Sequence, residues 1–125
     1  SLLVTGVQTC ALPIWEIQSV FYNNKYVGIS YSDTKKENSW HIKVYDMNGK
    51  TVMENDTEIA YNRIELLDNN EICVRDDYNC ELFTIHSIRK FRYTFDRQLY
   101  NVLSGSDGQN YTLVLNGEIE EVRLQ

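Results

Sequence analysis

The sequence predicts an all-β protein, an antiparallel meander of four-stranded repeats. Apolar and polar residues alternate through most of the chain after Trp15, and Asp, Asn and Gly recur between the alternating segments. No segment shows the sustained apolar stripe, with a period of about 3.6 residues, that an amphipathic helix needs. Alternation with a period of two places apolar side chains on one face of a strand. We therefore expect strands throughout and almost no helix.

About eleven strands are expected from this alternation and from the turns between them. They are Ile17–Tyr22, Tyr26–Tyr31, Trp40–Asp46, Thr51–Glu54, Ile64–Leu67, Glu71–Arg75, Glu81–His86, Lys90–Phe95, Leu99–Leu103, Asn110–Leu115 and Glu118–Leu124. The clearest hairpin turn lies at 46–49, where Asp46 and Asn48 can close Asx-type hydrogen bonds and Gly49 accepts a positive φ.

An internal repeat groups these strands. Residues 21–29 overlay residues 66–74 at an offset of 45, and residues 68–74 overlay residues 107–113 at an offset of 39. Four-stranded units of about 40–45 residues are the spacing of β-propeller blades, although two alternating patterns also align by chance. Residues 15–125 are thus predicted to form a partial β-propeller of about 2.75 blades. Its units cover residues 17–56, 61–97 and 99–125.

The chain resembles the last blades of an uncharacterised bacterial propeller-like family in the segments KYVGISYS, WHIKVYDMNGK and EIEEVRLQ. The resemblance covers residues 15–125. It implies that the chain is a fragment of an extracytoplasmic protein held at the cell membrane by an N-terminal anchor. The upstream blades of that parent protein are then partners of this fragment. No activity follows from the resemblance.

Residues 1–14 differ from the rest of the chain, because they carry no charge and hold the only proline, Pro13. Val4–Ile14 resembles a translated sequencing adapter, which encodes VTGVQTCALPI codon by codon. A signal peptide would need a basic start and an unbroken apolar core, which Gly6 and Gln8 interrupt. A buried first strand is the alternative by composition. We expect residues 1–14 to be an artefact on a metagenomic fragment whose native part begins near Trp15.

Net charge and hydropathy exclude two classes of function. Eighteen acidic residues against twelve Lys and Arg give a formal charge of −6, and a nucleic-acid binder usually carries a basic surplus. No apolar run approaches the roughly 18 residues of a membrane span. Neither nucleic-acid binding nor membrane contact is expected within the fragment.

Each motif that could be catalytic or bind a metal is better explained as a turn, a loop or part of a strand. His41 and His86 have no acids or thiols at ligand spacing, so they are predicted to lie on strand faces or the surface. The segment 104–108 lacks the GxSxG pattern of a nucleophile elbow and is predicted to be a turn. The segment 46–49 lacks the later ligands of a calcium loop. Asp76 and Asp77 are expected in a solvated loop. The sequence thus predicts no catalytic, cofactor-binding or metal-binding residue.

Cys73 and Cys80 are predicted to be free thiols on strands, with a local disulfide or a metal pair as the alternatives. Cationic residues interleave with rings between residues 89 and 97, which is compatible with a surface that stacks on nucleic-acid bases. An outer strand explains this spacing more simply. Phe91, Tyr93 and Phe95 then share one inward face, while Lys90 and Arg92 face solvent.

We therefore predict a non-enzymatic binding or scaffold module for an unknown protein or surface ligand, without cofactor. One alternative is a closed antiparallel β-barrel that binds a small apolar ligand. Another is the remnant of a propeller enzyme whose site lies in the missing part.

Deleting residues 1–14 should leave the thermal unfolding and the β-sheet circular dichroism of the chain unchanged, because an adapter-derived segment contributes no packing. A loss of more than about 1 kcal/mol, which is typical of a damaging core change, would show instead that the segment is an integrated strand.

Overall fold

A computed structural model describes residues 15–33, 40–57 and 61–124. These residues form eleven strands and no helix, so none of them forms a helix that could cross a membrane. The segment that resembles an adapter lies outside the described residues. The strands are β1 (Trp15–Tyr22), β2 (Tyr26–Asp33), β3 (His41–Asp46), β4 (Thr51–Asp56), β5 (Arg63–Leu66), β6 (Ile72–Arg75), β7 (Asn79–Phe83), β8 (Arg89–Thr94), β9 (Leu99–Ser104), β10 (Asn110–Leu115) and β11 (Glu118–Arg123).

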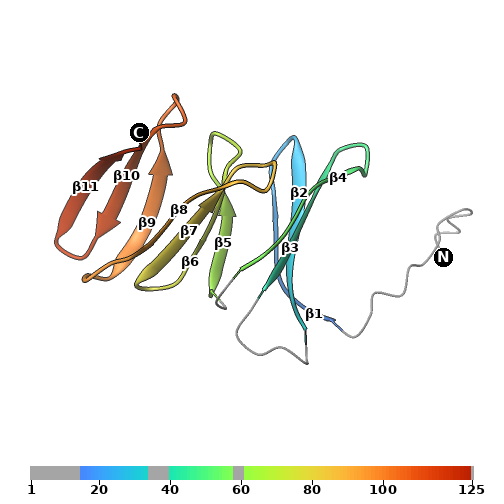
Figure 1. The fold of residues 1–125 in the computed structure, drawn as a ribbon, viewed down its shortest axis with the longest axis horizontal. Coiled ribbons are helices and arrows are strands. Elements are labelled where there is room, and N and C mark those ends of the chain that lie inside the picture. The colour runs from blue at the N-terminus through green and yellow to red at the C-terminus, as the bar shows by residue number, and fades with distance from the viewer. Residues whose placement is uncertain (1–14, 34–39, 58–60, 125) are drawn as a thin grey trace, which may run out of the picture.

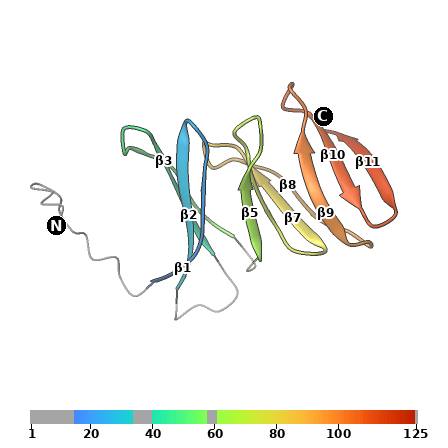
Figure 2. The ribbon, with the colours of Figure 1, turned by 180° about the vertical axis from the view of Figure 1, so that it is seen from behind.

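The strands form three antiparallel meanders, each built from consecutive strands. The first sheet has the order β1-β2-β3-β4, the second β5-β6-β7-β8 and the third β11-β10-β9. The sheets stand side by side in a row, from the first in blue and green to the third in orange and red (Figure 1), and remain distinct when seen from behind (Figure 2). The prediction of an all-β antiparallel meander is confirmed.

The alternative prediction of a closed antiparallel β-barrel is wrong. A barrel needs one continuous hydrogen-bonded sheet whose first and last strands pair. In the described residues β4 and β5 belong to different sheets, as do β8 and β9. The apolar side chains therefore lie between separate sheets and not inside a closed cylinder.

One predicted strand is too long. The sequence suggested a strand over Glu81–His86, but β7 ends at Phe83 and residues 84–88 form a turn. The Thr84 hydroxyl oxygen accepts hydrogen bonds from the backbone N–H of His86 (3.3 Å) and Ile88 (3.2 Å), and Ser87 has a φ of 69°. A hydroxyl that bonds the nearby backbone in this way competes with strand pairing.

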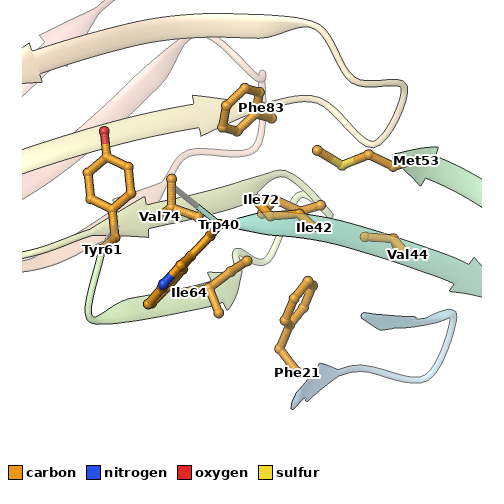
Figure 3. Close-up of a cluster of buried hydrophobic side chains, with 10 residues drawn as sticks. All are labelled: Phe21, Trp40, Ile42, Val44, Met53, Tyr61, Ile64, Ile72, Val74 and Phe83. Carbon is orange, nitrogen blue, oxygen red and sulfur yellow. The ribbon is translucent and has the colours of Figure 1, made fainter. Parts of the chain in front are cut away.

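The first apolar core fills the space between the first and second sheets (Figure 3). Ile42 and Val44 of β3 meet Ile72 and Val74 of β6, and all four side chains are fully buried. The other buried members are Phe21, Trp40, Met53, Tyr61, Ile64 and Phe83. Since the residues that β3 and β6 contribute to this core are two positions apart along each strand, each sheet presents one face to it.

The second core joins the second and third sheets. The strands β6 and β7 turn their other face to it, with Cys73, Cys80 and Leu82. The third sheet contributes Leu99, Val102, Tyr111, Leu113 and Leu115. The second sheet is therefore covered on both faces, which is why every residue of β6 is buried.

The turns at one end of the sheets are closed by side chains and linked across the first interface. The Asn23 side-chain oxygen accepts hydrogen bonds from the backbone N–H of Lys25 and Tyr26, both at 2.8 Å. Its Nδ2 donates to Oδ1 of Asn70, also at 2.8 Å, in the β5–β6 turn. This bond fixes the first sheet against the second at the end where the β1–β2 and β5–β6 turns meet.

Gly28 is required by close packing. It lies directly opposite Phe21 in the β1–β2 register, and a Cβ at residue 28 would overlap the Phe21 ring. Two residues farther on β2, the hydroxyl of Ser30 is buried without a hydrogen-bond partner in the described part of the chain. Gly28 and Ser30 share one face of β2, because they are two residues apart.

Gly28→Ala should lower the free energy of unfolding by about 1–3 kcal/mol, because the methyl group displaces the Phe21 ring from the core. Urea unfolding measures the effect. Ser30→Ala is the matched control on the same strand face. It should be neutral or stabilising, since it removes an unpaired buried hydroxyl. Equal losses in both variants would contradict the assigned role of Gly28.

Candidate binding groove

A groove of about 290 Å³ lies between the second and third sheets. One wall consists of the rings of Phe91 and Tyr93 on β8 and of Phe95, which follows β8 directly, and β10 and β11 form the other. The remaining lining residues are Asp96, Tyr111, Leu113, Leu115, Glu118, Glu120, Val122 and Leu124. This is the largely apolar hollow with a few polar groups that binding sites in proteins usually show.

The β10–β11 register decides which side chains of β11 face the groove. Glu118, Glu120 and Val122 lie opposite Leu115, Leu113 and Tyr111 respectively. Directly opposed residues of an antiparallel pair share one face, and these three residues of β10 are buried in the second core. Two carboxylates of β11 therefore border an apolar surface.

The groove is acidic. Asp96, Glu118 and Glu120 line it, and its lining has no lysine or arginine among the described residues. Arg97 Nε lies 3.7 Å from Glu118 Oε2 at one end. No ion pair within the described ranges involves Glu120. Such a surface attracts a ligand that is cationic and in part apolar.

A polar cluster closes the interface next to Tyr111. Lys90 Nζ donates to Glu71 Oε2 at 2.7 Å and to the Tyr111 hydroxyl at 2.8 Å. It also bonds the carbonyl of Gly108, and the Tyr111 hydroxyl donates to Glu71. Because these residues come from the second and third sheets, the cluster ties the two sheets together.

The prediction that Lys90 faces solvent is wrong. Its side chain is only 20% exposed, because the β7–β8 ladder is irregular between Leu82 and Phe83. Leu82 pairs with Phe91 and Phe83 pairs with Arg89, so Lys90 is the extra residue of a β-bulge. A β-bulge changes the direction of the side chains around it. Arg92 is exposed as predicted.

Within this cluster the pKa values of Lys90 and Tyr111 are both raised. Burial lowers the pKa of the Lys90 ammonium, but the hydrogen bonds with Glu71 and Tyr111 outweigh it, so the pKa is raised. Burial, and then the hydrogen bond to Glu71, raise the pKa of the Tyr111 hydroxyl. Lys90 therefore stays charged and Tyr111 stays neutral around neutral pH.

The rings of Phe91, Tyr93 and Phe95 lie mainly where an outer strand would place them. Phe91 and Phe95 are half-buried and pack on the second core. Tyr93 is 59% exposed and touches Phe95, with 4.8 Å between ring centroids. The three rings share the groove face, as the alternation predicted, but Tyr93 remains accessible.

Neither histidine lines this groove. His41 on β3 pairs with Asp56 on β4 and stacks on Tyr31, with 5.2 Å between ring centroids. His86 is exposed in the turn after β7. Within the described ranges no three His, Cys, Asp or Glu side chains gather as metal ligands would.

The acidic turn residues bond to the backbone. Asp46 accepts N–H bonds from Asn48 (2.9 Å) and Lys50 (3.0 Å) in the β3–β4 hairpin. Asp76 accepts N–H bonds from Tyr78 and Asn79 at 2.9 and 2.7 Å.

Asp107 makes the equivalent bonds in the segment 104–108. Its carboxylate accepts N–H bonds from Gln109 and Asn110, both at 2.9 Å. The bond from Gln109, followed by the bond from Asn110, lowers the pKa of the Asp107 carboxyl. The predictions of a hairpin turn at 46–49 and of a turn at 104–108 are confirmed.

Cys73 and Cys80 are free, fully buried thiols on β6 and β7. Their Sγ atoms lie 3.5 Å apart. The hydrogen bond with Cys80, together with burial, raises the pKa of Cys73 well above its usual value. Because the thiolate is the reactive form, the Cys73 thiol is predicted to be inert in the folded protein.

One buried carboxylate is not among the site residues that the sequence pattern indicated. Glu81 on β7 is 1% exposed, and it accepts hydrogen bonds from the Tyr61 hydroxyl (2.6 Å) and from Arg89 Nη1 (3.3 Å). Burial, and then this bond, strongly raise the pKa of Tyr61. The available signal was spacing, because Glu81 stands two residues before the core residue Phe83 and so shares its face.

The family to which the sequence is similar has no assigned function. The sequence matches a family of unknown function, DUF5711, over residues 11–124. The chain belongs to the DUF5711 family. No curated protein matches it. Membership in DUF5711 confirms an uncharacterised family, while the propeller ring and the membrane anchor of the parent protein stay predictions.

Lys90→Met should lower the free energy of unfolding by about 1–3 kcal/mol, because it leaves the buried carboxylate of Glu71 without its cation. Urea unfolding measures this loss. Adding Glu71→Gln should restore part of the stability, since the uncompensated charge is removed. Lys50→Met, at an exposed turn position, is the control and should change stability little. Similar small effects at both lysines would show that the cluster does not tie the sheets.

Proposed function

We propose that this DUF5711 chain is a non-enzymatic binding or scaffold module, formed by the last blades of a larger propeller-like protein. The observation that carries the proposal is that both outer faces of the three-sheet row expose large apolar side chains. These faces are suited to pack against further sheets, as the inner faces do at the two interfaces already formed.

The outer face of the first sheet carries Val20, Tyr22 and Val27. Tyr22 and Val27 are directly opposed in the β1–β2 register, and Val20 is two residues from Tyr22. Their exposed fractions are 59% for Val20, 76% for Tyr22 and 38% for Val27. A sheet face that permanently meets water is usually polar, so this surface supports a missing neighbour.

The outer face of the third sheet is similar. Leu103 of β9 lies opposite Thr112, and Ile119 of β11 lies opposite Val114. Leu103 is 49% exposed and Ile119 is 71% exposed. Because contiguous exposed apolar surface marks interaction sites, the row of sheets is suited to continue on this side too.

The turns offer a place for a partner protein or surface ligand. The β1–β2 and β5–β6 turns line a polar hollow of about 400 Å³ with Asn23, Lys25, Asp68 and Asn70 among others. Propellers bind at mouths where turns from several blades converge. The extracytoplasmic location and the membrane anchor of the parent protein are supported by the family resemblance of residues 15–125.

If the outer faces are unfilled interfaces, the purified chain should bind a hydrophobic dye and self-associate as its concentration rises. Tyr22→Lys combined with Ile119→Lys should weaken both, because each places a charge on one outer face. Dye fluorescence and sedimentation velocity measure the two effects.

The control combines Asn24→Lys and Asn116→Lys, which add the same charge at exposed turns and should leave both properties unchanged. A monodisperse wild-type monomer that binds no dye would contradict the stacking role.

A further inference from the structure

The third sheet ends at an unpaired edge. β11 pairs with β10, and in the described residues no strand pairs with its other edge. The first and second sheets each have a fourth strand in that position, β4 and β8. The free edge presents a row of unpaired backbone N–H and C=O groups, which is a template for another strand.

The groove lies where a fourth strand of the third sheet would pack. At the first interface, the fourth strand β4 buries Met53 against the second sheet, at 1% exposure (Figure 3). At the second interface no described strand takes this place. The rings of β8 stay partly uncovered there, and the groove of about 290 Å³ runs between them and β11. A strand added to β11 would place every second side chain against these rings.

The charge of the groove indicates which side chains fit. Glu118 and Glu120 face it from β11, and Asp96 joins them. Opposite charges on neighbouring strands attract, whereas like charges that face each other are unfavourable. Lysine or arginine at the groove-facing positions would pair with the carboxylates, and their methylene stems would lie along Tyr93 and Phe95.

A second copy of this chain is a poor occupant. Edge-to-edge pairing of two β11 strands would bring together Glu118, Glu120 and Glu121 from both copies. Such clustered charge on an edge strand opposes self-pairing. The charges of β11 therefore favour a segment of different sequence that carries the opposite charge.

We infer that β11 is a strand-acceptor edge for an extended, basic segment of a partner protein, which pairs with Glu118–Arg123 and inserts alternate cationic side chains into the groove. Strand addition of this kind gains affinity from main-chain hydrogen bonds and specificity from side-chain pockets. The inference rests on the proposed binding role but concerns a surface separate from the outer faces.

The probe is a synthetic, fluorescently labelled peptide of six residues, the length of β11, in which lysine alternates with valine. Fluorescence anisotropy at low salt measures its affinity for the full chain. A matched peptide with glutamate in place of lysine should bind at least roughly tenfold more weakly, a difference of about 1.4 kcal/mol.

Two further peptides distinguish strand addition from simple charge attraction. Each is N-methylated at one of the two alternating sets of backbone amides. An added strand bonds through the amides of every second residue, so one methylated set should abolish binding and the other should leave it intact. Equal binding by both would overturn the strand-acceptor assignment.

A matched pair of variants tests which face of β11 the lysine side chains of the peptide contact. Glu120→Lys should weaken the lysine peptide by roughly tenfold, because Glu120 faces the groove. Glu121→Lys makes the same change of charge on the opposite face of β11 and should have a much smaller effect. Equal effects would mean unspecific attraction and would overturn the proposal. If no peptide binds while the outer-face variants reduce self-association, the strand-acceptor edge fails and the stacking function stands.

Discussion

Small antiparallel sheets become stable only when an apolar face is covered, and this requirement governs the whole molecule. The second sheet meets it on both faces, through Ile72 and Val74 on one side and Cys73 and Leu82 on the other. The first and third sheets meet it on one face each. Their cores thus depend on the central sheet, and the uncovered outer faces and the groove beside β11 are consequences of the same geometry.

Apolar packing alone leaves sheets free to slide, and polar contacts restrict this freedom. The bond between Asn23 and Asn70 fixes the first interface at one end. The cluster of Lys90, Glu71 and Tyr111 does the same at the second interface. These groups are partly or fully withdrawn from water, so each needs its partner from the neighbouring sheet. The contacts therefore favour one alignment of the sheets over others.

The carboxylates of β11 both limit the pairing of this edge with a second copy and favour its pairing with a basic strand. Charge on an edge strand limits pairing with other copies of the same chain. The same charge beside the rings of β8 creates a surface that favours a basic strand. The carboxylates of β11 repel the β11 strand of a second copy and attract a basic strand. Because both effects act at the same residues, this edge is selective for the basic strand.

The sequence alone was sufficient to predict the strands and most of the turns. Period-two alternation predicted all eleven strands, because each strand keeps one face in a core and one face outward or in the next core. The turn at 46–49 was predictable since Asp46 and Gly49 act on their immediate backbone neighbours. Such signals are local, so they do not depend on how the sheets pack.

The tertiary structure decided what depends on register and on neighbouring sheets. The bulge that turns Lys90 toward Glu71 results from the pairing of β7 with β8, and Glu81 is buried because Tyr61 and Arg89 come together around it. The groove exists only where β8 faces a third sheet of three strands. Spacing could place Glu81 on the core face, but the partners of Glu81 and Lys90 come from other strands and turns, so only the packed sheets reveal these contacts.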